Sequence, residues 1–202
     1  EGRTAAAWKE IRKGSKELSL ARGSESGQVI KRVELKESQS PKYVALNENQ
    51  KTAVAGVEKL LSGALSDRYS KAIASIEVQS LEVQGSGEDP PQRAYFQGRR
   101  HGGEGETVFL ARGAGNQEAT LAHELGHGLE GNFNVYSAAQ GFLHLRVGLE
   151  PAKAMGAGYS AYEVGRDDDF HKAFGEGARY VGKHYKTNDT EIVSMGMEKM
   201  VS

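Results

Sequence analysis

Residues 119–132 read ATLAHELGHGLEGN and contain the pattern H-E-x-x-H, formed by His123, Glu124 and His127. Side chains four positions apart lie on one face of an α-helix, so the two histidines can bind a single metal ion. Another face of the same helix is apolar and predicts packing against a core; it carries Leu121, Leu125 and Leu129. The segment is therefore predicted to be a partly buried helix that presents a metal site.

The residues on either side of the motif agree with this prediction. Asn116 can cap the start of the helix, and Gly128 and Gly131 can end it. The segment ETVFLARG (106–113) before it has the pattern of a strand, and an edge strand beside a metal can bind an extended peptide by β-augmentation. The motif is expected by chance only about 0.02 times in such a chain. The alternative is a surface helix with two histidines and no metal.

The residue types of the motif match those of a hydrolytic zinc site. Bound zinc lowers the pKa of a water ligand to about 7 and polarises a carbonyl group. A carboxylate beside that water can take its proton and pass it to the leaving amine. Glu124 lies on the flank of the face that carries His123 and His127, so we predict that it is this general base.

A catalytic zinc site needs a third protein ligand, which the motif helix does not obviously supply. Glu130 is too close along the same helix to complete the site. A predicted C-terminal helix offers Glu191 and Glu198, seven positions apart on one face, although an acid at Glu191 also suits a helix cap. The candidates from the residues alone are Glu191, Asp169, Glu163 and His184.

The composition excludes several classes of protein. Of 202 residues, 38% are hydrophobic, which suits one domain, or one domain with a small addition. A net charge of −1 gives no overall positive field that would attract nucleic acid or an anionic membrane. The chain has no cysteine, so neither disulfides nor thiolate metal ligands can form. No apolar run approaches the roughly 18 residues of a membrane span.

Hydrophobic periodicity predicts the remaining elements. Helices are expected at 4–13, 47–64, 135–147 and 189–200, and strands at 28–35, 76–83 with a break at Ser80, 93–98 and 106–113. The last helix has an apolar stripe formed by Val193, Met197 and Met200. Residues 36–41, 85–92 and 156–176 are predicted to be loop or irregular, and the 26 glycines favour many such connections.

The helix TLAHELGHGLEG resembles the active-site helix of the zincin metallopeptidases. The metzincin subtype is excluded, because its pattern has Gly at position 130 and His at position 133, where this chain has Glu130 and Phe133. In the gluzincin-like branch, a Glu on a downstream helix completes the site. In toxins resembling anthrax lethal factor, a Tyr and a short Asn-containing loop precede that Glu, and the run from Tyr185 through Asn188 to Glu191 is similar.

This resemblance implies that His123, His127 and Glu191 bind Zn²⁺ and that Tyr185 stabilises the oxyanion of the tetrahedral intermediate. Glu198 then becomes a candidate for orienting a histidine. The runs TEIVSMGME and YVGKHY also resemble metallopeptidase domains of phage and prophage head-associated proteins and of polymorphic toxins. The likeness covers residues from about 106 to 200. The chain departs from the lethal-factor pattern at Ser194-Met195, where that pattern has small and acidic residues.

We therefore expect an α+β, zincin-like fold, with a small twisted sheet over the motif helix and a helical C-terminal half. Residues 1–66 are expected to form an N-terminal helical and linker region, and residues 67–202 the metallopeptidase domain. The expected function is zinc-dependent cleavage of a protein or peptide substrate, in which Glu124 assists the attack of zinc-bound water. The alternatives are a virion structural or assembly protein whose zinc site has little turnover, and a non-peptidase zinc hydrolase.

The expected context is a larger phage-related or toxin protein, with other domains of that protein as partners. The chain begins at Glu1 without a methionine, which favours a processed product or a piece of a longer protein, and no signal peptide is visible. The absence of cysteine is compatible with a phage particle, an injected or secreted effector, or the bacterial cytoplasm.

Overall fold

The computed structural model describes residues 33–64, 67–82, 93–98, 105–113, 115–131, 133–147, 151–155, 163–166, 182–185 and 189–201. The predictions for the helix at 4–13, for most of the strand at 28–35, for the loop at 85–92 and for Asp169 lie outside these ranges. No helix in the described part of the chain is long and apolar enough to span a membrane.

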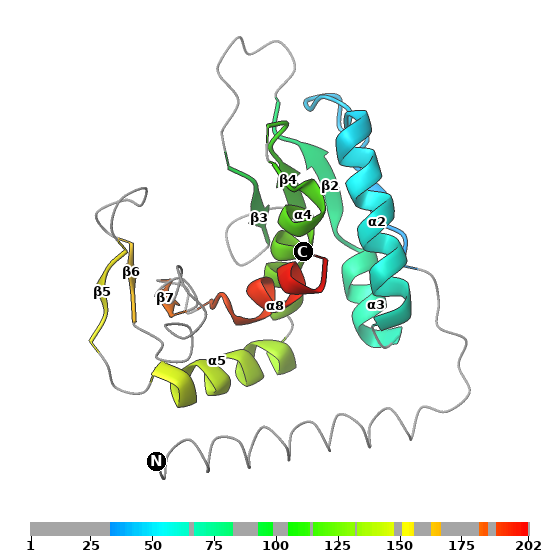
Figure 1. Cartoon of the computed structure of the whole chain (residues 1–202). Coiled ribbons are helices and arrows are strands. Elements are labelled where there is room, and N and C mark those ends of the chain that lie inside the picture. Colours follow the sequence, from blue (N-terminus) through cyan, green and yellow to red (C-terminus); the bar gives the residue numbers. More distant parts are fainter. Residues whose placement is uncertain are drawn as a thin grey trace. The chain divides into compact units, whose positions relative to one another are not determined.

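The main sheet has four strands in the order β1-β2-β4-β3 (Figure 1). They are β1 (Lys36–Glu37), β2 (Glu77–Ser80), β3 (Tyr95–Gln97) and β4 (Thr107–Leu110). The first three strands in this order are parallel, and β3 pairs with β4 in the antiparallel direction. The expectation that the strand within 106–113 forms an edge is therefore wrong, because β4 is paired on both sides. Among the described strands, the edge next to it is β3.

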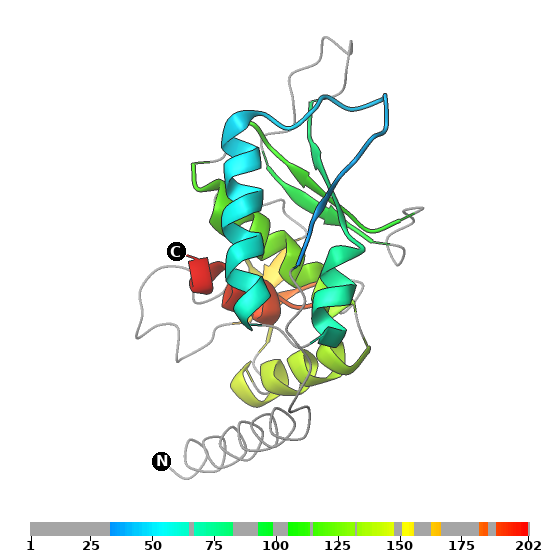
Figure 2. The ribbon, with the colours of Figure 1, turned by 90° about the vertical axis from the view of Figure 1, so that its right-hand side faces the viewer.

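Two helices lie side by side on one face of this sheet, α2 (Glu48–Ala64) and α4 (Gln117–Glu130) (Figures 1 and 2). A short helix that was not predicted, α3 (Asp67–Ala74), also packs against α4. The core between the helices and the sheet is fully buried and apolar; it includes Val57, Leu61, Ile73, Val78, Val108, Leu110, Leu121 and Leu125. Each such leucine contributes about 1.5–3 kcal/mol by burial. The leucines of α4 therefore hold the motif helix firmly on the sheet.

Helix α2, which the sequence assigns to the N-terminal region, packs on the main sheet. The predicted helix at 47–64 is confirmed, and Asn47 caps it by accepting a hydrogen bond from the Gln50 backbone at 2.9 Å. Gln50 in turn donates from its side chain to the Leu110 carbonyl at 2.9 Å. Arg32–Ser202, which include α2, form one compact unit by their contacts, and the division after residue 66 stays a prediction.

The two ends of α4 follow the predicted caps only in part. Asn116 caps the start, where its side chain accepts a hydrogen bond from the Ala119 backbone at 3.1 Å, and Gly131 lies at the C-cap. Gly128 does not end the helix, which continues to Glu130. A Cβ at Gly128 would lie 2.5 Å from the Cδ1 atom of Ile76 and 3.2 Å from the Cε2 atom of Phe96 in β3, so this glycine leaves room for the two side chains that pack under α4. Packing overrides its low helix propensity.

The C-terminal helix α8 (Ile192–Val201) crosses α4 at Gly126. A Cβ on Gly126 would lie 2.4 Å from the Cα atom of Ser194, so only glycine lets the two backbones come this close. Met197 is buried and Val193 packs against the core, as predicted, but Met200 is 48% exposed. The apolar face runs instead from Met197 to Val201, which lies four residues further along the helix.

The rest of the described C-terminal half is not wholly helical. Helix α5 (Phe133–Val147) agrees with the helix predicted at 135–147. A second, three-stranded antiparallel sheet follows, made of β5 (Lys153–Ala154), β6 (Val164–Gly165) and β7 (Lys183–His184). Its strands have two residues each, too few to show an alternating pattern in the sequence. The fold is mixed α and β, as expected, but a second sheet lies in the C-terminal half, where helices joined by irregular segments were predicted.

We expect Gly126→Ala to lower the free energy of unfolding by about 1–3 kcal/mol, the usual cost of overpacking, because the new methyl group would collide with the Ser194 backbone. Urea-induced unfolding measures this. Gly196→Ala on α8 is the matched control, since a Cβ there has no neighbour within 4 Å. It should raise the stability by about 0.5–1 kcal/mol through helix propensity. Equal stabilities of the Gly126 variant and the wild type would contradict the close crossing.

Candidate metal centre

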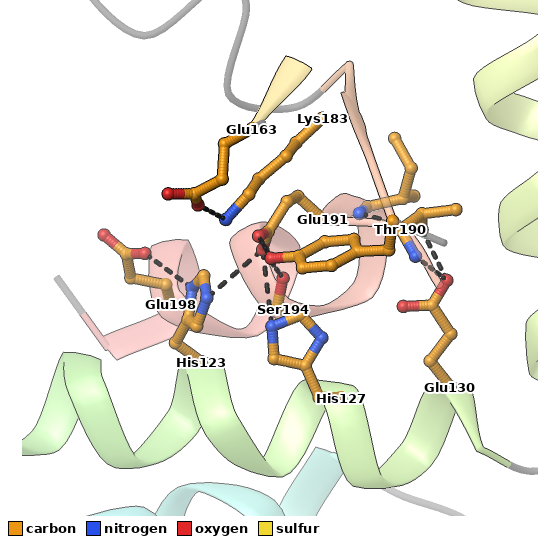
Figure 3. A network of polar contacts seen from close by, with 11 residues as sticks. His123, His127, Glu130, Glu163, Lys183, Thr190, Glu191, Ser194 and Glu198 are labelled. Carbon is orange, nitrogen blue, oxygen red and sulfur yellow. Dashed lines mark hydrogen bonds and ion pairs between the residues drawn. The ribbon is translucent and has the colours of Figure 1, made fainter. Parts of the chain in front are cut away.

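Helix α4 places the two motif histidines on one face, as the four-residue spacing requires. The ring centroids of His123 and His127 are 5.1 Å apart, and the rings are nearly perpendicular, at 78°. Their side chains are only 11% and 17% exposed. Both rings point from α4 toward the start of α8 (Figure 3).

Glu191 meets both histidines from the other helix. It lies directly before α8, at the N-cap position, where its carbonyl accepts a hydrogen bond from the Met195 backbone at 3.0 Å. Its Oε2 atom lies 3.2 Å from Nε2 of His123 and 3.4 Å from Nε2 of His127. The ligand atoms of these three residues all lie within 4.8 Å of one another. The structure thus brings together the three residues predicted as metal ligands.

The spacing of this group suits a tetrahedral zinc ion. Zinc bonds of about 2.0–2.2 Å at tetrahedral angles separate neighbouring ligand atoms by about 3.3–3.5 Å. The two N···O separations in the cluster, 3.2 and 3.4 Å, agree with that value. Imidazole and carboxylate are also the donors that catalytic zinc sites use. The donor types and the two N···O separations are therefore compatible with a bound zinc ion.

Two hydroxyl groups hold the Glu191 carboxylate in place. The Tyr185 hydroxyl donates a hydrogen bond to Oε1, and the Ser194 hydroxyl donates one to Oε2 at 2.8 Å. The sequence indicates no role for Ser194, which belongs to the pair that departs from the lethal-factor pattern. Its role could have been found from spacing, because residues three apart at the start of a helix share a face. Tyr185 lies beside the cluster, with its ring centroid 6.3 Å from that of His127.

Glu198, on the same face of the C-terminal helix as Glu191, contacts one of the two histidines. Its Oε2 atom lies 3.1 Å from Nδ1 of His123. A carboxylate oxygen can only accept a hydrogen bond, so this contact places a proton on Nδ1. Fixing that proton orients the ring and leaves Nε2, on the Glu191 side, to act as a metal ligand.

The cluster keeps a negative charge in a buried position. Burial lowers the pKa of both His123 and His127, but hydrogen bonding and attraction to Glu191 outweigh it, and each pKa lies above its usual value. Burial raises the pKa of Glu191, yet the hydrogen bonds to the two histidines hold that pKa well below its usual range. A buried carboxylate needs positive charge beside it. A divalent cation would supply that charge in place of two imidazolium protons.

Glu124 lies beside the cluster without belonging to it. It is 9% exposed, and burial raises the pKa of its carboxyl group, although the nearby histidines oppose this rise. A hydrogen bond to the backbone of Phe96 ties it to the edge strand β3. Its position on α4, adjacent to His123 and apart from the three ligand atoms, is the one expected of a general base.

The other residues considered as a third ligand are not part of the described cluster. Glu163 instead pairs with Lys183, whose Nζ atom lies 2.8 Å from its Oε1 atom. The same Nζ atom lies 4.6 Å from the ring centroid of Tyr185. Asp169 and the side chain of His184 lie outside the described part of the chain. Lys183, which is 5% exposed, was not predicted near the site, since nothing in its local sequence indicated the strand that carries it.

Comparisons of the chain with protein-family models, with curated proteins and with solved structures found no match. The site must therefore be interpreted from its own geometry. Its main feature is a buried group of two imidazoles and one carboxylate, drawn from two helices, with a second carboxylate beside it.

We expect Glu191→Ala to weaken zinc binding much more than Glu163→Ala. The first substitution removes one of three converging ligand atoms, whereas the second removes only the partner of Lys183. Competition with a chromophoric chelator measures the affinity, and circular dichroism checks that each variant is folded. If Glu163→Ala lowered the affinity as much as Glu191→Ala, this assignment of the third ligand would be wrong.

Proposed function

We propose that this protein is a zinc-dependent endopeptidase with a zincin-like fold, in which His123, His127 and Glu191 bind the metal and Glu124 is the general base. The observation that carries the proposal is the convergence of two imidazole nitrogens and one carboxylate oxygen at the spacing of a tetrahedral zinc site. Glu124 lies beside these ligands on α4, the helix that carries both histidines, where a general base for hydrolysis is needed.

The proposed chemistry divides between the metal and the chain. Bound zinc polarises a carbonyl group and lowers the pKa of water to about 7. Glu124 takes a proton from the attacking water and delivers it to the amine that leaves, so no free acid or base is needed. Glu198 holds the His123 ring in one orientation during this step.

Tyr185 is the proposed donor to the oxyanion. Its hydroxyl lies at the Glu191 carboxylate, next to the metal group, and can turn toward a negatively charged oxygen that forms there. Lys183, which pairs with Glu163, lies with its Nζ atom 4.6 Å from the centroid of the Tyr185 ring and packs over one face of it. The strand β7 and the residue after it thus present both groups to the site.

The number of ligands favours a catalytic over a structural zinc site. Structural sites are closed by four protein ligands, whereas catalytic sites use three and keep one position open. Among the described residues, the group has three members, and the nearby carboxylate of Glu198 contacts the far nitrogen of His123. This supports turnover over the alternative of a virion protein that keeps zinc for stability.

The proposed substrate is a protein or peptide. Among the described strands, β3 pairs only with β4, and it lies next to Glu124, which accepts a hydrogen bond from the Phe96 backbone. A sheet edge of this kind can bind an extended chain through its remaining backbone groups. The resemblance of the C-terminal segment extends the proposal to a domain of a larger phage-related or toxin protein. That context rests on the sequence motifs alone.

We expect Glu124→Gln to keep both the fold and zinc but to lose nearly all hydrolysis, because an amide cannot accept the proton of the attacking water. Peptide cleavage is followed by mass spectrometry on an unfolded protein mixture, with zinc content measured in parallel. Glu118→Gln, in the first turn of the same helix, is the control and should cleave as the wild type does. Equal cleavage by the Glu124 variant and the wild type would leave the proposal without a mechanism.

We expect Tyr185→Phe to reduce the turnover per bound zinc by about 10²–10³-fold, the usual effect of removing one oxyanion donor, when the variant is assayed with enough zinc to fill its site. Tyr43→Phe is the control, since Tyr43 packs on Phe109 in the second hydrophobic cluster of the sheet. A variant that lost zinc affinity yet kept the turnover per bound zinc would show that Tyr185 only orients Glu191.

A further inference from the structure

Glu130, at the end of α4, is a buried acid that the proposed chemistry does not use. It is 1% exposed and lies in the last turn of a helix, where the macrodipole disfavours negative charge. Burial raises the pKa of its carboxyl group to about 7. Its Oε2 atom has no hydrogen-bond partner within the described ranges. Each of these features costs stability, so the contact made by Oε1 needs an explanation.

That contact joins the two halves of the metal centre. Oε1 of Glu130 accepts a hydrogen bond from the Thr190 backbone at 3.0 Å and a second from the Thr190 hydroxyl (Figure 3). Thr190 is fully buried and directly precedes Glu191. The Thr190 hydroxyl oxygen in turn accepts a hydrogen bond from the backbone of Ile192, the first residue of α8, at 3.2 Å.

We propose that Glu130 is a positioning residue that clamps Thr190 and thereby holds the Glu191 carboxylate where it can bind metal together with His123 and His127. The inference takes from the proposed function only that Glu191 is a metal ligand. It assigns Glu130 no contact with metal or substrate.

The contact between Glu130 and Thr190 holds a part of the backbone that the hydrogen bonds of α4 and α8 leave free. Thr190 lies before the first turn of α8, so the hydrogen bonds of that helix do not hold its backbone N–H. Glu130 lies one turn after His127, so it ties Thr190 to the helix that carries both histidines. A metal site requires its ligands within about 0.5 Å of the productive geometry, which one firm contact beside each ligand can provide.

A positioning role and a simple stabilising role predict different results for matched variants. Glu130→Ala removes both hydrogen bonds, whereas Glu130→Gln keeps an amide oxygen that can accept both. Gln50→Ala is the control for general damage. Gln50 is also fully buried and also bonds to the backbone across 60 residues, but its side chain bonds to Leu110 on β4 and not to a residue beside a metal ligand.

The experiment measures zinc affinity of the full chain by competition with a chromophoric chelator, at a temperature where circular dichroism shows each variant folded. Glu130→Ala should bind zinc about 10–100-fold more weakly, the usual effect of losing a contact that orients a ligand. Glu130→Gln should stay within a few-fold of wild type. Gln50→Ala should unfold at a lower temperature and keep the wild-type affinity. If Glu130→Ala fails to fold, Thr190→Val, which keeps only the backbone bond, should lose about fivefold.

The results separate this inference from the proposed function. A wild type that binds no zinc overturns the proposed function and, with it, the role of the clamp in metal binding. A wild type that binds zinc, with Glu130→Ala or Thr190→Val equally tight, overturns the clamp alone. Failure of folded Glu130→Gln to restore the affinity overturns it as well, because the amide oxygen replaces the acceptor.

Discussion

The crossing of α4 and α8 at Gly126 is the contact on which the metal centre depends. The Ser194 backbone occupies space that any larger side chain at Gly126 would need, so the two helices meet backbone to backbone. Glu191, three residues before Ser194, consequently reaches the Nε2 atoms of both histidines. Glycine inside a helix costs about 0.5–1 kcal/mol relative to alanine. In return for this cost, the glycine lets α4 and α8 lie close enough for Glu191 to reach the histidines.

Four glutamates around the centre share one side-chain chemistry but have different surroundings. Glu191 accepts hydrogen bonds from two histidines and two hydroxyls, which keeps it ionised although it is fully buried. Burial raises the pKa of both Glu124 and Glu130, but Glu124 lies beside the histidines whereas Glu130 bonds to Thr190. Glu198 is less buried and, within the described ranges, contacts the far nitrogen of His123. Position relative to the imidazoles, more than residue type, distinguishes the roles proposed for them.

The two halves of the centre are held in different ways. Helix α4 is seated on the sheet by buried leucines and by the close approach at Gly128, so His123 and His127 have a rigid base. The other half lies on a two-residue strand and on the residues just before α8, which have little core of their own. Specific polar contacts, from Glu130 to Thr190 and from Lys183 to Glu163, join this half to its surroundings. Binding of a metal across both halves would add to the stability of the fold.

The sequence by itself determined what is local. A helical period with a capping residue predicted α2 and α4, and the four-residue spacing within α4 put His123 and His127 on one face. Resemblance, and not periodicity, singled out Glu191 among several acids. The tertiary structure alone decided that Glu191 meets both histidines, that β4 is an interior strand, and that Glu130 bonds across 60 residues to Thr190. These features depend on how close two helices can come and on which buried polar atoms find partners, and neither is encoded in the pattern of a single segment.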